Sequence, residues 1–202
     1  MENELICIRP SGATHRLVLL HGWGADANDL IPLGEDLIKG LAEIKMELIS
    51  LRAPLKHPDG LGRQWYGLFP PDWEAVPASI KKLRERIEAL SYGSIPLSKT
   101  VLLGFSQGGA MAMNVGYEMK LAGLICCSSY PHPNWNPPNG GAPVLLFHGK
   151  DDQVVPLEAS RKLFNILKQN QMDTELFVFD GGHEIPQNLL SKMQISISRW
   201  IL

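Results

Sequence analysis

The sequence predicts an α/β protein built on an open, doubly wound and mostly parallel sheet. Short apolar runs alternate along the chain with longer segments in which apolar residues recur at helical spacing. The runs are apolar throughout, as in V-L-L-G-F at residues 101–105, which is typical of strands buried on both faces. Strands that alternate with helices form a parallel sheet covered on both sides.

Each element follows from one of these two patterns. The apolar runs predict strands at residues 17–20, 46–51, 100–105, 121–127, 143–147 and 174–179. The helical spacing predicts helices at residues 30–44, 80–90, 110–119, 157–169 and 186–202. Pro156 and Pro186 fit the first turns of the last two helices, where proline is tolerated. In open sheets of this kind ligands bind beyond the carboxyl ends of the strands, so we expect site residues directly after strands.

Length and charge indicate one globular domain over residues 1–202. The chain has 202 residues, 45% of them hydrophobic and 20% charged, with a net charge of −2. This balance argues against intrinsic disorder, and also against nucleic-acid binding, which needs a basic surface. No stretch has the ~20 consecutive apolar residues of a membrane helix, so we expect no contact inside a membrane.

The cysteines and the N-terminus indicate a reduced, cytoplasmic protein. Three cysteines, two of them adjacent at Cys126 and Cys127, fit neither a disulfide framework nor the spacing of a zinc site. Residues 1–4 are acidic where a signal peptide would be basic. We therefore expect no metal, and the oligomeric state stays open, a homodimer included.

The strongest motif is G-F-S-Q-G-G, Gly104 to Gly109, between a predicted strand and an alanine-rich helix. This is the G-x-S-x-G nucleophile elbow in the strand–turn–helix context that it requires. A sharp turn exposes Ser106, and glycines leave room for that turn. A serine hydroxyl becomes a nucleophile only when a neighbouring base takes its proton. The alternative, a serine that merely caps a helix, explains the flanking glycines less well.

A serine elbow predicts an acid and then a histidine further along the chain. The strand at 143–147 is followed by Asp151 and Asp152, and spacing alone does not choose between them. His148 and His183 each follow a strand, but only His183 comes after both acids, so it is the expected base. We expect His148 to have a packing or hydrogen-bonding role. His132 lies in a loop near the predicted site.

The segment His21-Gly22-Trp23-Gly24 follows the first predicted strand, where the oxyanion-binding loop of such enzymes lies. The expected donors are the main-chain N–H groups of Trp23 and Gln107. A rival interpretation reads Gly22 to Ala27 as a dinucleotide-binding pattern, with Arg52 meeting the 2′-phosphate of NADP. That pattern is weak alone and leaves the serine, acid and histidine unexplained.

Together, H-G-W-G, R-A-P, Q-W-Y, G-F-S-Q-G-G, H-G-K-D-D-Q-V-V-P and G-G-H-E-I resemble the phospholipase/carboxylesterase family, which includes acyl-protein thioesterase-like α/β-hydrolases. The resemblance runs from residue 17 to the final helix. It implies an α/β-hydrolase fold, a triad of Ser106, Asp152 and His183, and Trp23 and Gln107 as oxyanion donors. The sequence departs from the family at Ala25 and in residues 128–131, which lack a common glycine. Both departures affect the expected pocket rim and hence substrate preference.

These observations predict a serine carboxylesterase without a cofactor, cleaving esters or thioesters of a small or lipid-like acyl substrate through an acyl-serine intermediate. The loop at 128–142 is too short for a lid domain, so we expect an open groove for short to medium acyl chains, between residues 52–74 and 128–141. Lysophospholipids and acyl-proteins fit the same chemistry, and a non-catalytic binding module of the same fold is the remaining alternative. The expected substrate contacts are Trp65, Tyr66, Leu68, Tyr130 and Trp135.

Overall fold

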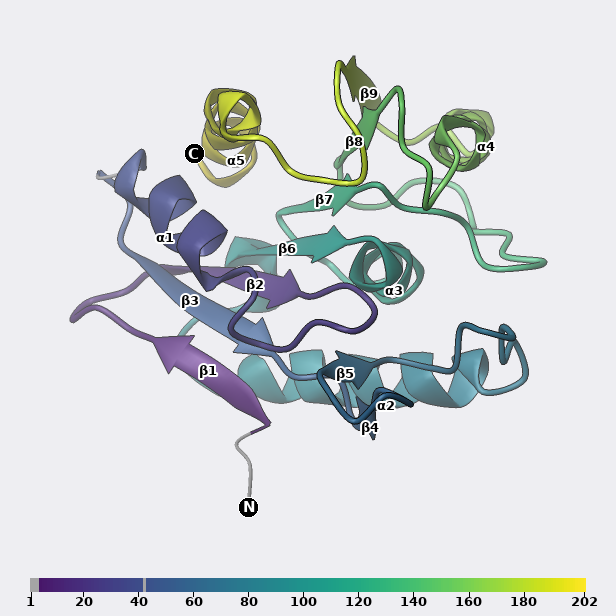
Figure 1. The fold of residues 1–202 in the computed structure, drawn as a ribbon. Coiled ribbons are helices and arrows are strands. Elements are labelled where there is room, and N and C mark those ends of the chain that lie inside the picture. The colour runs from purple at the N-terminus through teal and green to yellow at the C-terminus, as the bar shows by residue number, and fades with distance from the viewer. Residues whose placement is uncertain (1–3, 42) are drawn as a thin grey trace.

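The computed structural model, which describes residues 4–41 and 43–202, has a seven-stranded sheet between two layers of helices (Figure 1). The strand order is β1-β3-β2-β6-β7-β8-β9, and every neighbouring pair is parallel except β1 with β3. The predicted fold class is confirmed. The strands are β1 Leu5–Ile8, β2 His15–Leu20, β3 Met46–Leu51, β6 Thr100–Phe105, β7 Gly123–Cys127, β8 Val144–Gly149 and β9 Thr174–Phe179.

Helices cover both faces of the sheet, as the uninterrupted apolar strands require. Alternate residues of β2 belong to different cores: Val18 and Leu20 pack with α2, α3 and α4, whereas Leu17 and Leu19 pack with α1 and α5. Each face of the sheet therefore forms one side of a separate hydrophobic core. The helices are α1 Ile31–Lys39, α2 Val76–Leu90, α3 Gln107–Gly116, α4 Leu157–Gln169 and α5 Leu190–Ile201.

Several element boundaries differ from the sequence prediction. The sequence analysis missed β1, an apolar but half-exposed edge strand of four residues, and the small hairpin of β4 (Leu55–Lys56) with β5 (Arg63–Gln64), whose strands are polar or mixed and two residues long. The helix predicted at 30–44 ends at Lys39 before Gly40, although Leu41 is still buried. The last helix begins later than predicted, after a 3₁₀ turn at Gln187–Leu189.

The parallel strands end on one edge of the sheet, and this places the site. The loops that follow β2, β6, β8 and β9 carry residues 21–24, 106–109, 150–156 and 180–186. The polar motifs of the sequence therefore meet at the carboxyl edge, where ligands of open α/β sheets bind.

Candidate active site

Ser106 occupies the sharp turn between β6 and α3. Its backbone has φ 54° and ψ −119°, a conformation that a residue with a side chain adopts only where the surroundings enforce it. Its N–H donates to the carbonyl oxygen of Cys127 on the neighbouring strand, at 2.8 Å. A Cβ at Gly104 would collide with the Gly108 carbonyl, and one at Gly108 with that of Leu20. The glycines thus permit α3 to return closely over the sheet.

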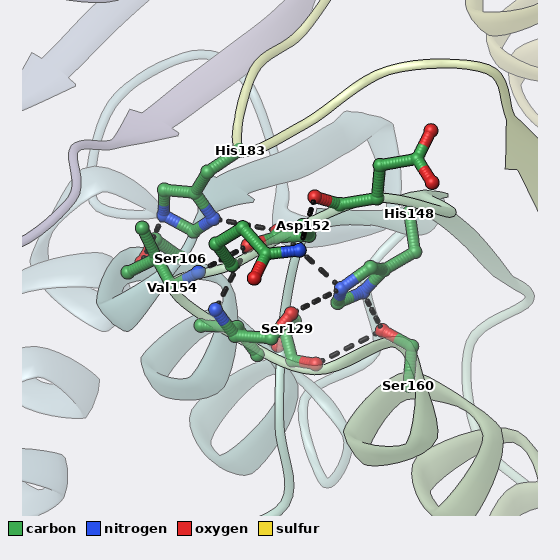
Figure 2. A network of polar contacts seen from close by, with 10 residues as sticks. Ser106, Ser129, His148, Asp152, Val154, Ser160 and His183 are labelled. Atoms are coloured by element: carbon green, nitrogen blue, oxygen red, sulfur yellow. Dashed lines mark hydrogen bonds and ion pairs between the residues drawn. The ribbon is translucent and has the colours of Figure 1, made fainter.

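The structure brings Ser106, His183 and Asp152 into one hydrogen-bonded chain (Figure 2). His183 Nε2 lies 3.0 Å from Ser106 Oγ, and His183 Nδ1 lies 2.7 Å from Asp152 Oδ2. Asp152 is buried and Asp151 is exposed. Of the two neighbouring carboxylates that spacing could not separate, only Asp152 reaches the histidine. The catalytic roles of Ser106, His183 and Asp152 remain a prediction that rests on this geometry.

The surroundings of Asp152 favour its ionised form. Its Oδ1 accepts the backbone N–H groups of Val154 at 2.9 Å and Val155 at 2.8 Å. Burial alone raises the pKa of the Asp152 carboxyl, but the hydrogen bonds from His183, Val155 and Val154 outweigh it and bring the pKa below its ordinary value. An ionised Asp152 accepts the His183 Nδ1 proton, which leaves Nε2 free to accept the serine proton.

Of the two predicted oxyanion donors, Gln107 directly follows Ser106 in the chain, and Trp23 lines the same pocket as Ser106. Gln107 opens α3, where the first N–H groups of a helix have no intrahelical acceptor. Trp23 lies in the loop after β2, and its indole N–H donates to Gln64 Oε1 at 2.9 Å. The next residue, Gly24, has φ +79° and donates its N–H to the Arg63 carbonyl at 2.9 Å. The β4–β5 hairpin therefore holds the Trp23 loop.

The Gln107 side chain has a role that the sequence did not reveal. It is fully buried; Oε1 accepts the N–H of Trp65 at 3.0 Å, and Nε2 donates to the carbonyl of Tyr66 at 2.8 Å. These bonds tie the start of α3 to the 65–66 segment. A glutamine after Ser106 gave no signal of this contact, because its partners are backbone atoms 41 and 42 residues away.

Ser106 and His183 line a pocket of about 400 Å³. Leu68 and Tyr130, two of the predicted substrate contacts, also line it, and their contact with substrate stays a prediction. Its other lining residues are Gly22, Trp23, Ala25, Asp29, Phe69, Pro71, Trp73, Phe105, Val154, Val155, Pro156 and Ala159. The lining is largely apolar, which suits the acyl part of an ester.

Three expected substrate contacts lie outside this pocket. Trp65 is 1% exposed, and its indole N–H donates to the His21 carbonyl at 2.9 Å. Tyr66 is fully buried, with its hydroxyl 2.7 Å from that of Tyr130. Trp135 packs edge-on against Tyr117, with ring centroids 5.8 Å apart. Large aromatic side chains stabilise the fold when they are buried. Here Trp65 and Tyr66 fix their loop to the sheet and do not line the pocket.

The second wall of the pocket also differs from the prediction. Apart from Tyr130, the 128–141 loop contributes no lining residue to it, and residues 154–159 take its place. The sequence analysis assigned no pocket role to Val154, Val155 and Pro156, because they directly precede a predicted helix. Their position just after Asp152, beyond the end of a strand, could have indicated that they lie beside the site.

The remaining buried histidines are bonded to protein groups. His21 Nε2 accepts the N–H of Ala53 at 3.1 Å, so Nδ1 donates to the Gly22 carbonyl at 2.8 Å. His132 lies between Asn114 and the Tyr66 hydroxyl, each 3.0 Å away, and does not line the pocket. His148 is fully buried and bonded, as expected from its place before the acid.

The geometry does not support the dinucleotide interpretation. Arg52 holds the carboxylate of Asp26 with two bonds, of 2.7 and 2.9 Å. The glycine loop leads through turns to α1, which begins only at Ile31, so the helix that follows the glycines does not begin at them, as the dinucleotide-binding pattern requires.

Other features of the described residues do not compete with this site. A larger hollow of about 740 Å³ is lined by Arg52, Arg63, Lys82 and Arg86 among others, but by none of the three residues of the chain Ser106–His183–Asp152. Within residues 4–41 and 43–202, no helix is long and apolar enough to cross a membrane. In the same residues no group of three or more His, Cys, Asp or Glu side chains is arranged to hold a metal ion.

A sequence model of the family described as phospholipase/carboxylesterase matches residues 1–201. The chain belongs to the phospholipase/carboxylesterase family. It is 31% identical over 178 residues to acyl-protein thioesterase 1 homolog 2 of Dictyostelium discoideum, which covers 77% of this chain and 78% of the relative. It is 25% identical to acyl-protein thioesterase 1 of Eremothecium gossypii, covering 92% of this chain and 87% of that one.

Solved structures agree with this membership. The crystal structure of esterase PE8 is similar with a TM-score of 0.84 and 28% identity, and the match covers 98% of both chains. The predicted family is confirmed, and the fold is that of an α/β-hydrolase. As a phospholipase/carboxylesterase family member, the protein is a hydrolase of ester bonds.

Proposed function

We propose that the protein is a serine carboxylesterase or thioesterase that uses Ser106 as nucleophile, His183 as general base and acid, and Asp152 to orient the histidine. One observation carries the proposal: the hydrogen-bonded chain from Ser106 through His183 to Asp152 opens into an apolar pocket. This arrangement of nucleophile, base and orienting acid is the one that acyl transfer requires.

In the first half of the reaction, Ser106 Oγ attacks the acyl carbonyl while His183 Nε2 takes its proton. The ionised Asp152 stabilises the resulting imidazolium through its bond to Nδ1. The main-chain N–H groups of Trp23 and Gln107 donate to the oxyanion. His183 then protonates the departing alcohol or thiol, which leaves an acyl-serine.

In the second half, water takes the place of the alcohol. His183 removes a proton from that water, the hydroxide attacks the acyl-serine, and the oxyanion forms again between the same two N–H groups. Collapse of this intermediate frees the carboxylic acid and returns the proton to Ser106. The protein groups supply every proton transfer, so the scheme uses no cofactor.

The pocket favours short to medium acyl chains. Its volume of about 400 Å³ is bounded by residues 68–73 on one side and 154–159 on the other. Asp29, Tyr130 and His183 are the titratable side chains of its described lining, and Asp29 is the carboxylate among them. An uncharged acyl chain of a soluble ester, a thioester, a lysophospholipid or an acylated protein fits this chemistry, and chain length is the property that the walls select.

The chain is proposed to form one α/β-hydrolase domain over residues 1–202 and to act in the cytoplasm. The three cysteines support the second point, because all are free: Cys7 is exposed, and Cys126 and Cys127 are buried in β7. Adjacent strand residues point to opposite faces of the sheet and do not pair with each other. A homodimer is compatible with this proposal.

The deciding experiment is covalent labelling of the purified protein with a fluorophosphonate, followed by peptide mass spectrometry. We expect stoichiometric modification of Ser106 and release of p-nitrophenol from p-nitrophenyl acetate through octanoate. An unlabelled, inactive but folded protein would favour the non-catalytic binding module instead.

A further inference from the structure

His148 is a second histidine beside Asp152, and the reaction scheme does not use it. It lies in β8, four residues before Asp152, and its side chain is completely buried. Its Nε2 lies 2.8 Å from the carbonyl oxygen of Val155 and 3.4 Å from Asp152 Oδ2 (Figure 2). The acid is therefore flanked by His183 on one side and His148 on the other.

The partners of His148 fix which nitrogen carries its proton. A carbonyl oxygen can only accept, so the 2.8 Å contact requires a proton on Nε2. The Val155 carbonyl takes this N–H, and Asp152 Oδ2, which accepts the hydrogen bond from His183 Nδ1, lies 3.4 Å from the same nitrogen. The other oxygen, Oδ1, is already occupied by two backbone N–H groups.

The imidazole of His148 is itself held from the opposite side. Its Nδ1 lies 2.7 Å from the hydroxyl of Ser160 on α4, and this hydroxyl lies 2.9 Å from the carbonyl oxygen of Ser129. Ser160 is also fully buried. The ring is thus anchored to α4 and to the segment after β7, and it cannot follow a movement of the Asp152 side chain.

We propose that His148 is a positioning residue for the triad: its Nε2–H binds the Val155 carbonyl and so holds the 152–155 turn, which keeps the Asp152 carboxylate in line with His183 Nδ1. This inference rests on the proposed function of Ser106, His183 and Asp152. Without His148, the Val155 carbonyl would lose this donor, and the turn whose Val154 and Val155 N–H groups bind Oδ1 could shift. The Asp152 carboxylate would then move with the turn and lengthen the bond that orients His183.

The charge state of His148 fits this role. Burial lowers its pKa, against the opposing effects of the Val155 hydrogen bond and the Asp152 charge, with His183 lowering it further. A neutral ring has one proton, on Nε2, which it donates to the Val155 carbonyl, while its bare Nδ1 accepts the single proton of the Ser160 hydroxyl, so no second full positive charge stands beside His183. The negative charge of Asp152 stays available to the imidazolium that forms on His183.

The test compares two substitutions that differ in a single property. His148→Gln keeps an amide N–H near the position of Nε2, whereas His148→Leu removes the donor and fills the space. Thr174→Val is the matched control, because Thr174 is a buried polar residue at the opposite end of the neighbouring strand β9. Each variant is assayed for kcat and KM with p-nitrophenyl butyrate, and for thermal unfolding.

The second readout is the downfield proton NMR resonance of the His183 Nδ1–H bond to Asp152, which does not depend on turnover. We expect His148→Leu to lower kcat by about 10- to 100-fold, the size typical of outer hydrogen-bond partners of functional histidines, with KM little changed. We expect the resonance to shift or broaden. His148→Gln should recover most of kcat and the resonance, and Thr174→Val should change neither.

Two results would overturn the inference. One is a folded His148→Leu variant with wild-type kcat and an unmoved resonance; the other is equal impairment in the Gln and Leu variants. If His148→Leu does not fold, Ser160→Ala takes its place, because it frees the ring while leaving the space beside Asp152 filled. Fluorophosphonate labelling of the wild type separately tests the proposed function, and the NMR readout still decides on His148 if that labelling fails.

Discussion

The imidazole Nε2 of His183 lies 3.0 Å from the hydroxyl oxygen of Ser106, although the two residues are 77 positions apart in the chain. The contact is set by the sheet, because β6 and β9 end at the same edge and each continues into a loop that carries one of the two residues. The predictions below follow from this contact and from the groups packed around it.

Replacing the nucleophile should abolish turnover and leave the fold intact. We expect Ser106→Ala to lower kcat by about 10⁴- to 10⁶-fold, because the remaining groups only bind and polarise the substrate. Hydrolysis of p-nitrophenyl butyrate measures the loss, and circular dichroism melting checks the fold. A purified Ser106→Ala protein with full esterase activity would refute the serine mechanism.

The two adjacent carboxylates should behave very differently. Asp152→Asn should lower kcat by about 10⁴-fold, because an amide at this position favours the wrong histidine tautomer. Asp151 is exposed and does not contact His183, so Asp151→Asn should change kcat little. Each variant is the control for the other. If Asp151→Asn lowered kcat more than Asp152→Asn, the catalytic acid would be Asp151 and not Asp152.

Acyl-chain selectivity should depend on the pocket walls. Each methylene buried in the pocket contributes about 0.8 kcal/mol, so kcat/KM should rise with chain length and then level off when the pocket is full. Leu68→Trp, which adds bulk to the lining, should shift the plateau to shorter p-nitrophenyl esters. Trp135→Phe is the control and should not move it, because Trp135 packs on Tyr117 outside the pocket. A steady rise to a C16 ester with monomeric substrate would contradict a short pocket that fills with medium-length chains.

Stability should fall between neutral and mildly acidic pH because of His132. Burial lowers the pKa of this histidine to about 4, whereas the unfolded chain has the ordinary value near ~6.5. Between these values the unfolded state binds more protons, so stability falls as the pH falls from about 6.5 to 4 and the loss is complete below the folded-state pKa. The difference corresponds to about 3 kcal/mol.

Urea unfolding at pH 7 and pH 4.5 measures this effect. His132→Leu lacks the titrating group, so its stability should change less between the two pH values than that of the wild type, even if it is less stable at both. An equal pH dependence in the two proteins would show that His132 is not the responsible group.

The fold class and the placement of Ser106 at a sharp strand-to-helix turn could be predicted from the sequence because they depend on local rules. The elbow needs glycines at fixed offsets from Ser106, and buried parallel strands are apolar throughout. Asp152 could not be distinguished from Asp151 by spacing, since the choice depends on which side chain turns inward after β8. Family resemblance, and not the residues alone, made that choice.

The pocket walls were predicted less well, and for a physical reason. An aromatic residue in a long loop gains free energy equally by covering the sheet or by facing a cavity. Trp65 and Tyr66 cover the sheet because the Gln107 side chain binds their backbone. A contact between a side chain and the main chain leaves no periodic pattern in the sequence. The wall at 154–159 was missed since it combines a strand-end loop with the start of α4.

Val154 and Val155 serve the site twice, with different atoms. Their backbone N–H groups hold Asp152, while both residues line the pocket. The main-chain donors remain whichever side chain stands at these positions, proline excepted. Substrate range can therefore drift through substitutions here without disturbing the charge on the acid, so that natural variation or laboratory evolution has two adjacent positions at which selectivity can change while the chemistry is retained.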